Sequence, residues 1–168
     1  NFGRVYGMGA YTLSHDLNTS FKQAKNYLNE YFDKFSGVRN YLDFLKKFAH
    51  EHGYVKTLMN RIRCIPELNS SNVNMRNFGE RAAMNTPVQG SAADIMKCAM
   101  VRVYNRLKSE NLQAQIILQV HDELIIETPY DEEDRVKAIL KEEMENAVTL
   151  NVPLVVEMEV GHSWYDAK

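Results

Sequence analysis

The chain has 168 residues, of which 45% are hydrophobic and 25% charged, and a formal net charge of -2. No apolar run approaches the ~20 residues of a membrane helix, so the composition excludes a membrane-spanning protein and predicts a globular one with one or two domains. Cys64 and Cys98 are isolated, which predicts reduced thiols in the cytoplasm. The chain starts at Asn1 without a leader, so we expect it to come from a longer protein.

The charges are unevenly distributed. Between positions 56 and 81 five basic residues accompany only Glu67 and Glu80, whereas between positions 122 and 145 ten acidic residues accompany three basic ones. The small negative total alone argues weakly against a nucleic-acid partner. This uneven distribution of basic and acidic residues instead predicts one face that meets a polyanion and another that holds cations.

Two amphipathic helices are predicted near the start. The stretch 20–35, SFKQAKNYLNEYFDKF, places Ser20 and Gln23 at capping-box spacing and repeats apolar residues at the spacing of one helical face. The stretch 37–53 repeats this pattern and ends at Gly53, where a left-handed cap is expected. Residues 54–72 lose the helical period, which favours short strands and a loop.

The second half mixes helices and strands. Helical patterns cover about 74–85 and 89–110, and Pro87 between them predicts a kink or a break because it lacks an N–H donor. Residues 115–128 are rich in strand-forming residues, residues 131–147 predict an acidic amphipathic helix, and VPLVVEMEV (152–160) predicts a final strand. The predicted fold class is α+β.

QVHDELII (119–126) places three ionisable residues inside an apolar stretch. Two strand-length runs separated by two residues predict a tight hairpin whose tip presents His121, Asp122 and Glu123. Such residues bind hard cations. Adjacent strand residues point to opposite faces, so a further carboxylate has to come from elsewhere. The alternative is a solvated turn that is polar by chance.

NFGRVYGMG, at the start, combines aromatic residues with glycines. If this stretch is helical, Phe2 and Tyr6 lie one turn apart, beside Gly3 and Gly7 on the neighbouring face. Rings next to positions without side chains form a platform that a planar group can approach closely. The alternative is that both rings are core aromatics and that the glycines end a helix.

ERAAMNTPVQGSAADIMKCAM repeats polar groups every four residues, at Arg81, Asn85 and Gln89. On a helix these side chains form one stripe that can donate hydrogen bonds to acceptors in a DNA minor groove, where both kinds of base pair offer acceptors. The stripe would then test the shape of a base pair without reading its sequence. The alternative is a helix boundary at Asn85 with Gln89 as an ordinary surface residue.

In this order, the three stretches resemble motifs of the family A DNA polymerases, the bacterial DNA polymerase I type. NFGRVYG is similar to motif B, RAAMNTPVQGSAADIMK to the primer-template helix and LQVHDELI to motif C. GYVKTL and the closing SWYDAK also fit, so the resemblance covers essentially the whole chain. It implies template-directed addition of dNTPs to a primer 3′ end by a two-magnesium mechanism, in DNA replication and repair.

The resemblance also implies a role for each candidate residue. The rings of Phe2 and Tyr6 would contact the incoming nucleotide and the templating position. The residues that would contact primer-template DNA are Arg81, Asn85, Gln89 and His121. Asp122 would bind catalytic Mg²⁺, and Glu123 would be a second catalytic carboxylate that lies behind it.

The sequence departs from the family pattern in three ways. It lacks the basic residues that precede NFG and hold the triphosphate, it lacks the Asp of motif A, and NRIRCIP has fewer arginines than the family usually shows. We therefore expect a carboxy-terminal piece, with fingers and helical connecting parts in residues 1–110 and palm in residues 111–168. The upstream part of the same chain would be its partner, and the piece alone would be inactive.

Two other functions stay open on the residues alone. His121 and Asp122 could belong to a metal-dependent phosphohydrolase, although the other histidines show no metal-ligand spacing. The chain could also be a non-catalytic nucleic-acid-binding module.

Overall fold

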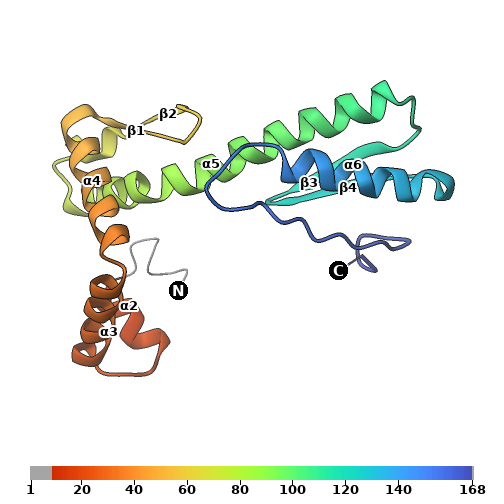
Figure 1. Cartoon of the computed structure of the whole chain (residues 1–168). Helices are drawn as coiled ribbons and strands as arrows, with labels where there is room; N and C mark the ends of the chain where they lie inside the picture. Colours follow the sequence, from red (N-terminus) through yellow and green to blue (C-terminus); the bar gives the residue numbers. More distant parts are fainter. Residues whose placement is uncertain (1–8, 168) are drawn as a thin grey trace. The chain divides into compact units, whose positions relative to one another are not determined.

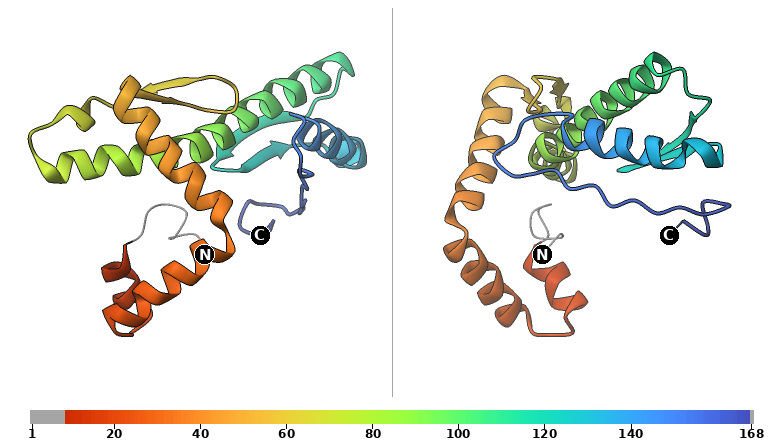
Figure 2. Two further views of the ribbon diagram at one scale, coloured as in Figure 1. Left: turned by 60° about the vertical axis from the view of Figure 1, so that its left-hand side comes forward. Right: turned by 45° about the vertical axis from the view of Figure 1, so that its right-hand side comes forward.

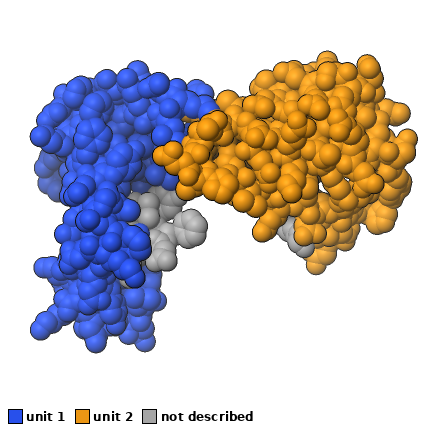
Figure 3. Space-filling model, viewed as in Figure 1, with its two compact units in different colours: residues 1–91 blue, residues 92–168 orange. Residues whose placement is uncertain are grey.

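The computed structural model describes residues 9–167 and has the predicted α+β class (Figure 1). The chain divides into two compact units, residues 1–91 and residues 92–168 (Figure 3). The division falls within the long helix α5. The assignment of residues 1–110 to fingers and 111–168 to palm stays a prediction. The elements in chain order are α2 (Ala10–Asp16), α3 (Phe21–Lys34), α4 (Ser36–His52), β1 (Tyr54–Lys56), β2 (Ile62–Cys64), a 3₁₀ turn (Pro66–Asn69), α5 (Val73–Ser109), β3 (Gln115–Val120), β4 (Glu123–Glu127), a 3₁₀ turn (Tyr130–Glu132) and α6 (Glu133–Glu145).

Both predicted early helices are present, with the predicted ends. Ser20 caps α3 by accepting a hydrogen bond from the Gln23 backbone N–H at 3.2 Å, and the Gln23 side chain accepts from the Ser20 backbone N–H at 3.3 Å. Helix α4 ends at Gly53, whose φ of 76° lies in the left-handed region that glycine adopts without a steric penalty. Helix α2 was not among the predicted elements.

The core of the first unit joins α4, the β1–β2 hairpin and the start of α5. Its buried side chains are Ala49, Val55, Ile65, Leu68 and Ala83. The two short strands pair antiparallel, with Val55 opposite Arg63. Both views of Figure 2 show this hairpin, in yellow, beside the first half of α5. The predicted short strands and loop over residues 54–72 are therefore confirmed.

Of the predicted kink or break at Pro87, the break is wrong, because α5 continues as one helix through this residue. Pro87 removes one backbone donor, but neighbouring hydroxyls bond to the helix backbone: Thr86 Oγ1 donates to the Ala82 carbonyl at 2.7 Å, and Ser91 Oγ donates to the Pro87 carbonyl. Thr86 and Pro87 are both buried. Tertiary packing thus holds a helix that local propensity disfavours.

The second unit packs the β3–β4 hairpin against α6 and the second half of α5 (Figure 2). Val103, Leu107 and Ile139 are buried there, and Ile116 and Leu124 of the hairpin pack against them. The strands pair antiparallel, with one register shift between Ile116 and Leu118. The predicted acidic helix is α6, and a single 3₁₀ turn precedes it.

The predicted final strand is wrong. In the part of the chain that the structure describes, residues 152–160 join no sheet, since the two sheets contain only β1 with β2 and β3 with β4. One backbone group of this segment is paired with a side chain, because Val156 N–H donates to Glu145 Oε1 at 3.2 Å. A strand needs a hydrogen-bonding neighbour, and an alternating sequence alone does not provide one. Among residues 9–167 no helix is long and apolar enough to cross a membrane.

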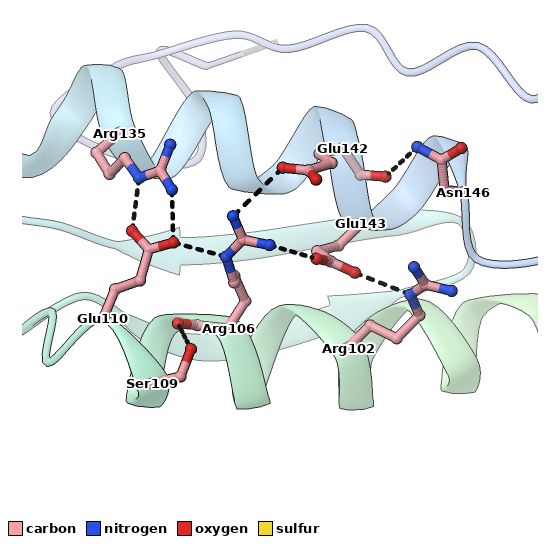
Figure 4. Close-up of polar contacts among 8 residues, drawn as sticks. All are labelled: Arg102, Arg106, Ser109, Glu110, Arg135, Glu142, Glu143 and Asn146. Carbon is pink, nitrogen blue, oxygen red and sulfur yellow. Dashed lines mark hydrogen bonds and ion pairs between the residues drawn. The ribbon is translucent and has the colours of Figure 1, made fainter.

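An ion-pair network joins α5 to α6 within the second unit (Figure 4). Glu143, with only 11% of its side chain exposed, accepts from Arg102 Nε at 2.8 Å and from Arg106 Nη1 at 3.3 Å. Glu110 accepts from Arg106 Nε at 2.6 Å and from two nitrogens of Arg135, both at 2.5 Å. Bidentate contacts of this kind fix geometry as well as charge.

This network predicts a loss of stability in acid. Hydrogen bonds from Arg135 and then Arg106 lower the pKa of Glu110 from 4.5 to about 2. A carboxylate with a lowered folded-state pKa stabilises the fold above its unfolded pKa, and this contribution disappears as pH falls from about 4.5 to about 2. Glu110→Gln should therefore lower the urea midpoint at pH 7 and flatten its dependence on pH in that window. Glu127→Gln, at an exposed position of β4, should leave the dependence unchanged.

Candidate functional site

The tip of the β3–β4 hairpin has the predicted two-residue turn. Val120 pairs with Glu123, so His121 and Asp122 alone connect the strands. His121 has a φ of 51°, in the left-handed region, and its carbonyl accepts a hydrogen bond from the Gln119 side-chain amide at 2.7 Å. This side-chain bond stabilises a turn conformation that a residue other than glycine rarely adopts.

All three ionisable residues of the tip are exposed. Asp122 and Glu123 make no ion pair with another of residues 9–167, so both carboxylates can accept a ligand. Nowhere in that range do three His, Cys, Asp or Glu side chains gather in a way that would hold a metal ion. The tip therefore fits Mg²⁺ as the source of one carboxylate ligand, with the other ligands supplied from elsewhere.

The predicted stripe lies on α5 in the first unit. Because the helix is unbroken, Arg81, Asn85 and Gln89 follow one another within an arc of about 80°. Arg81 and Gln89 are exposed, and Asn85 is half-buried. The Asn85 side-chain oxygen is buried without a hydrogen-bond partner among the described residues. An unpaired buried polar atom is unfavourable, so such an atom calls for an explanation beyond packing.

The β1–β2 hairpin is held against α5 beside this stripe. Ser91 Oγ accepts from the Leu58 backbone N–H at 2.9 Å, and Arg63 Nη1 donates to Thr86 Oγ1 at 3.2 Å. A Cβ at Gly90 would lie 2.7 Å from Thr57 Cγ2, so the hairpin approaches the helix where it has no side chain. This function of Gly90 was not predicted from the sequence. A glycine inside a helical pattern was the available signal.

The close approach of Thr57 to Gly90 predicts the effect of adding a methyl group at position 90. Gly90→Ala should destabilise the chain by about 1–3 kcal/mol, because the added methyl group meets the buried Thr57. Thr57→Ser removes only Cγ2 and keeps the hydroxyl that accepts from the Arg61 backbone N–H. Gly90→Ala in the Thr57→Ser background should therefore be neutral or stabilising, as expected for alanine in a helix. Urea unfolding of the four proteins measures this, and an equal loss in both backgrounds would contradict the contact.

The candidate nucleotide-binding residues Phe2 and Tyr6 lie outside the described residues. The stripe belongs to the first unit and the hairpin tip to the second. The structure thus shows the expected local geometry for the stripe and for the hairpin tip, and the roles of all these residues stay predictions.

Comparison with solved structures places the fold among polymerase domains. The structure is similar, with a TM-score of 0.95 and 44% sequence identity, to one described as the POL domain of Pol1 from M. smegmatis in complex with DNA primer-template and dNTP. The match covers 99% of this chain and 29% of that one. The profile of DNA polymerase family A matches residues 1–166, so the chain belongs to this family, as the sequence predicted.

Curated relatives match the chain over its full length. It is 55% identical over 168 residues to DNA polymerase I of Caldicellulosiruptor bescii and covers 20% of that protein. It is 51% identical over 168 residues to DNA polymerase I of Bacillus caldotenax and covers 19% of that protein. The chain therefore spans about a fifth of the length of these relatives.

Proposed function

We propose that the chain is the carboxy-terminal part of a DNA-directed DNA polymerase that adds dNTPs to a primer 3′ end in replication and repair. The observation that carries this proposal is the family match over residues 1–166, together with a structure that forms the predicted hairpin tip and polar stripe. Its partners are primer-template DNA, a dNTP and the remaining part of the same polymerase. We place it in the cytoplasm, in keeping with its two free cysteines.

Asp122 is the ligand for Mg²⁺ in this proposal, and Glu123 supports it from the start of β4. Mg²⁺ held there would supply the charge that activates the primer 3′-oxygen and neutralises the phosphates of the dNTP. The protein positions the metal ligand, because the paired strands hold the Asp122 carboxylate at the end of a short turn. His121, the adjacent turn residue, contacts the primer terminus.

The stripe on α5 binds the primer-template duplex. Arg81 and Gln89 expose donors to solvent, and the Asn85 amide completes the series. Donors at this spacing reach minor-groove acceptors that occupy similar places in both base pairs, so they sense pair shape rather than sequence. Phe2 and Tyr6 contact the incoming nucleotide and the templating position.

Gln89→Ala tests this function with a moderate change. In the complete polymerase, loss of one hydrogen bond worth about 1 kcal/mol should lower kcat/KM for extension about fivefold and weaken discrimination against a mismatched primer end. Single-turnover extension of matched and mismatched primers measures both effects. Val88→Ala, at an exposed apolar position beside Gln89, is the control and should change neither. Unchanged kinetics for Gln89→Ala on both primers would exclude the minor-groove role.

A second possible function applies to the 168 residues on their own, which would then be a non-catalytic nucleic-acid-binding module. The basic composition of the first unit favours this second possibility: it has twelve Lys and Arg residues and seven Asp and Glu residues. A titration of the isolated chain with primer-template DNA would measure binding, and primer extension with Mg²⁺ and dNTPs would show whether the chain also catalyses.

A further inference from the structure

Five aromatic rings follow one another along α4 and into β1. We call them the aromatic ladder, and they are Tyr41, Phe44, Phe48, His52 and Tyr54. The spacings of three, four and four residues within α4 place the first four rings inside an arc of about 80°, over a rise of about 16 Å. The ladder lies entirely within the first unit.

Each ring of the ladder contacts the next. The centroids of Tyr41 and Phe44 lie 6.5 Å apart with the rings at 23°, and those of Phe44 and Phe48 lie 5.8 Å apart. His52 stacks on Phe48 at 4.1 Å and 11°, and Tyr54 meets Phe48 edge-on at 5.5 Å. The His52 Nδ1 hydrogen-bonds the Phe48 carbonyl at 3.0 Å, which fixes its ring in the stack. The ladder is therefore ordered before any ligand binds.

The ladder is not part of the core. Helix α4 buries a neighbouring stripe of Leu42, Leu45 and Ala49, whereas Tyr41 is 46% and Phe44 56% exposed. His52 is also exposed, and Phe48 and Tyr54 are half-buried. Rings in mutual contact that are exposed or half-buried form an apolar patch, and such patches mark binding sites more often than isolated exposed residues do.

Positive charge accompanies the ladder. Lys56 lies over the Tyr54 ring, with its Nζ 5.8 Å from the ring centroid, at the end of the series. The first unit as a whole has twelve basic and seven acidic residues, whereas the second has eight basic and fifteen acidic ones. Rings beside cations on a basic unit are complementary to a ligand that combines planar faces with negative charge.

We propose that the aromatic ladder binds single-stranded DNA by stacking against its bases. Bases in a duplex cover each other's faces, so only an unpaired strand offers faces to protein rings, and the basic unit attracts its phosphates. The proposal rests on the polymerase function above, because a primer-template contains such a strand in its unpaired template. The ladder would therefore be a binding site for that strand, and its rings belong to neither the polar stripe nor the hairpin tip.

The test compares a strand with bases to the same strand without them. Fluorescence anisotropy of the complete polymerase would measure binding of a labelled oligothymidine and of an abasic oligonucleotide of equal length. Phe44→Ala and Phe48→Ala should each weaken binding of oligothymidine about fivefold or more and leave binding of the abasic strand unchanged. Phe44→Trp should retain the affinity for oligothymidine, since it keeps an aromatic face at this position.

Phe21→Ala is the matched control. Phe21 is 55% exposed, in the same unit and outside the ladder, so its removal should leave binding of both strands unchanged. An equal loss on both strands in the Phe44 and Phe48 variants, or no loss on either, would overturn the proposal. So would a change of oligomeric state in light scattering without a change in DNA affinity, which would show that the rings contact protein. Primer extension by the wild-type enzyme tests the proposed polymerase function separately.

Discussion

A protein consisting of the 168 residues alone should not extend a primer, whereas the complete polymerase should. The reason is the hairpin tip, where Asp122 and Glu123 stand without the other ligands of a metal site among residues 9–167. Magnesium binds through one or two carboxylates together with substrate phosphates, and a two-metal site needs carboxylates that bridge both ions. Positioning and charge neutralisation are nearly all that a protein contributes to phosphoryl transfer, so an incomplete site loses almost the whole rate.

The measurement is primer extension with Mg²⁺ by three proteins: the isolated chain, the complete polymerase and its Asp122→Ala variant. We expect the variant to lose extension by at least about 100-fold, because Asp122 supplies a metal ligand and its removal leaves the ion poorly held. Extension by the isolated chain above the level of that variant would mean that a further carboxylate of this chain completes the site. Asp94 and Asp166 would then be the first residues to substitute.

Much of the local structure follows from sequence because short-range rules determine it. The Ser20 and Gln23 cap depends on a three-residue spacing, and the left-handed end at Gly53 depends on the absence of a side chain. The two-residue turn at His121 and Asp122 follows from two apolar strands separated by two residues. Each pattern involves few neighbours, so it can be recognised without the tertiary fold.

Two wrong predictions, a break at Pro87 and a final strand over residues 152–160, both depend on distant contacts. Pro87 would end an isolated helix, but here it lies in buried surroundings and neighbouring hydroxyls bond to the backbone. Residues 152–160 alternate as a strand does, yet pairing needs a second strand that none of the described residues provides. Both outcomes are set by packing partners, which single-sequence patterns do not contain.

The sequence was sufficient to identify the candidate residues, but it did not predict the tertiary contacts around them. The sequence motifs identified the tip and the stripe, and the structure gives each the expected local geometry. The contact of Gly90 with Thr57 joins residues 33 positions apart, and the edge-on contact of Tyr54 with Phe48 crosses a helix end. Such contacts become visible only once the elements have been placed in space.

Ile139→Ala should loosen the hairpin that carries Asp122. Ile139 lies on α6, is fully buried and belongs to the cluster that also contains Val103 and the hairpin residue Leu124. Truncating a buried isoleucine removes apolar contact and leaves a cavity, with a loss of about 2–5 kcal/mol. If β3 and β4 open together with this core, the hydrogen exchange of their amides in the complete polymerase should accelerate at least about 30-fold. Primer extension should fall as well, because the carboxylate at the tip is then held less rigidly.

Val101→Ala provides the comparison for this last experiment. Val101 is on α5 in the same unit but is 59% exposed, so its truncation removes little buried surface. Its expected effect is within about 0.5 kcal/mol, with no change in hydrogen exchange at β3 and β4. If the two variants exchanged at the same rate, the hairpin would owe its order to contacts outside the Val103 and Ile139 cluster. If Ile139→Ala exchanged faster but extended primers normally, the position of Asp122 would be fixed by the turn itself, through Gln119 and the His121 carbonyl.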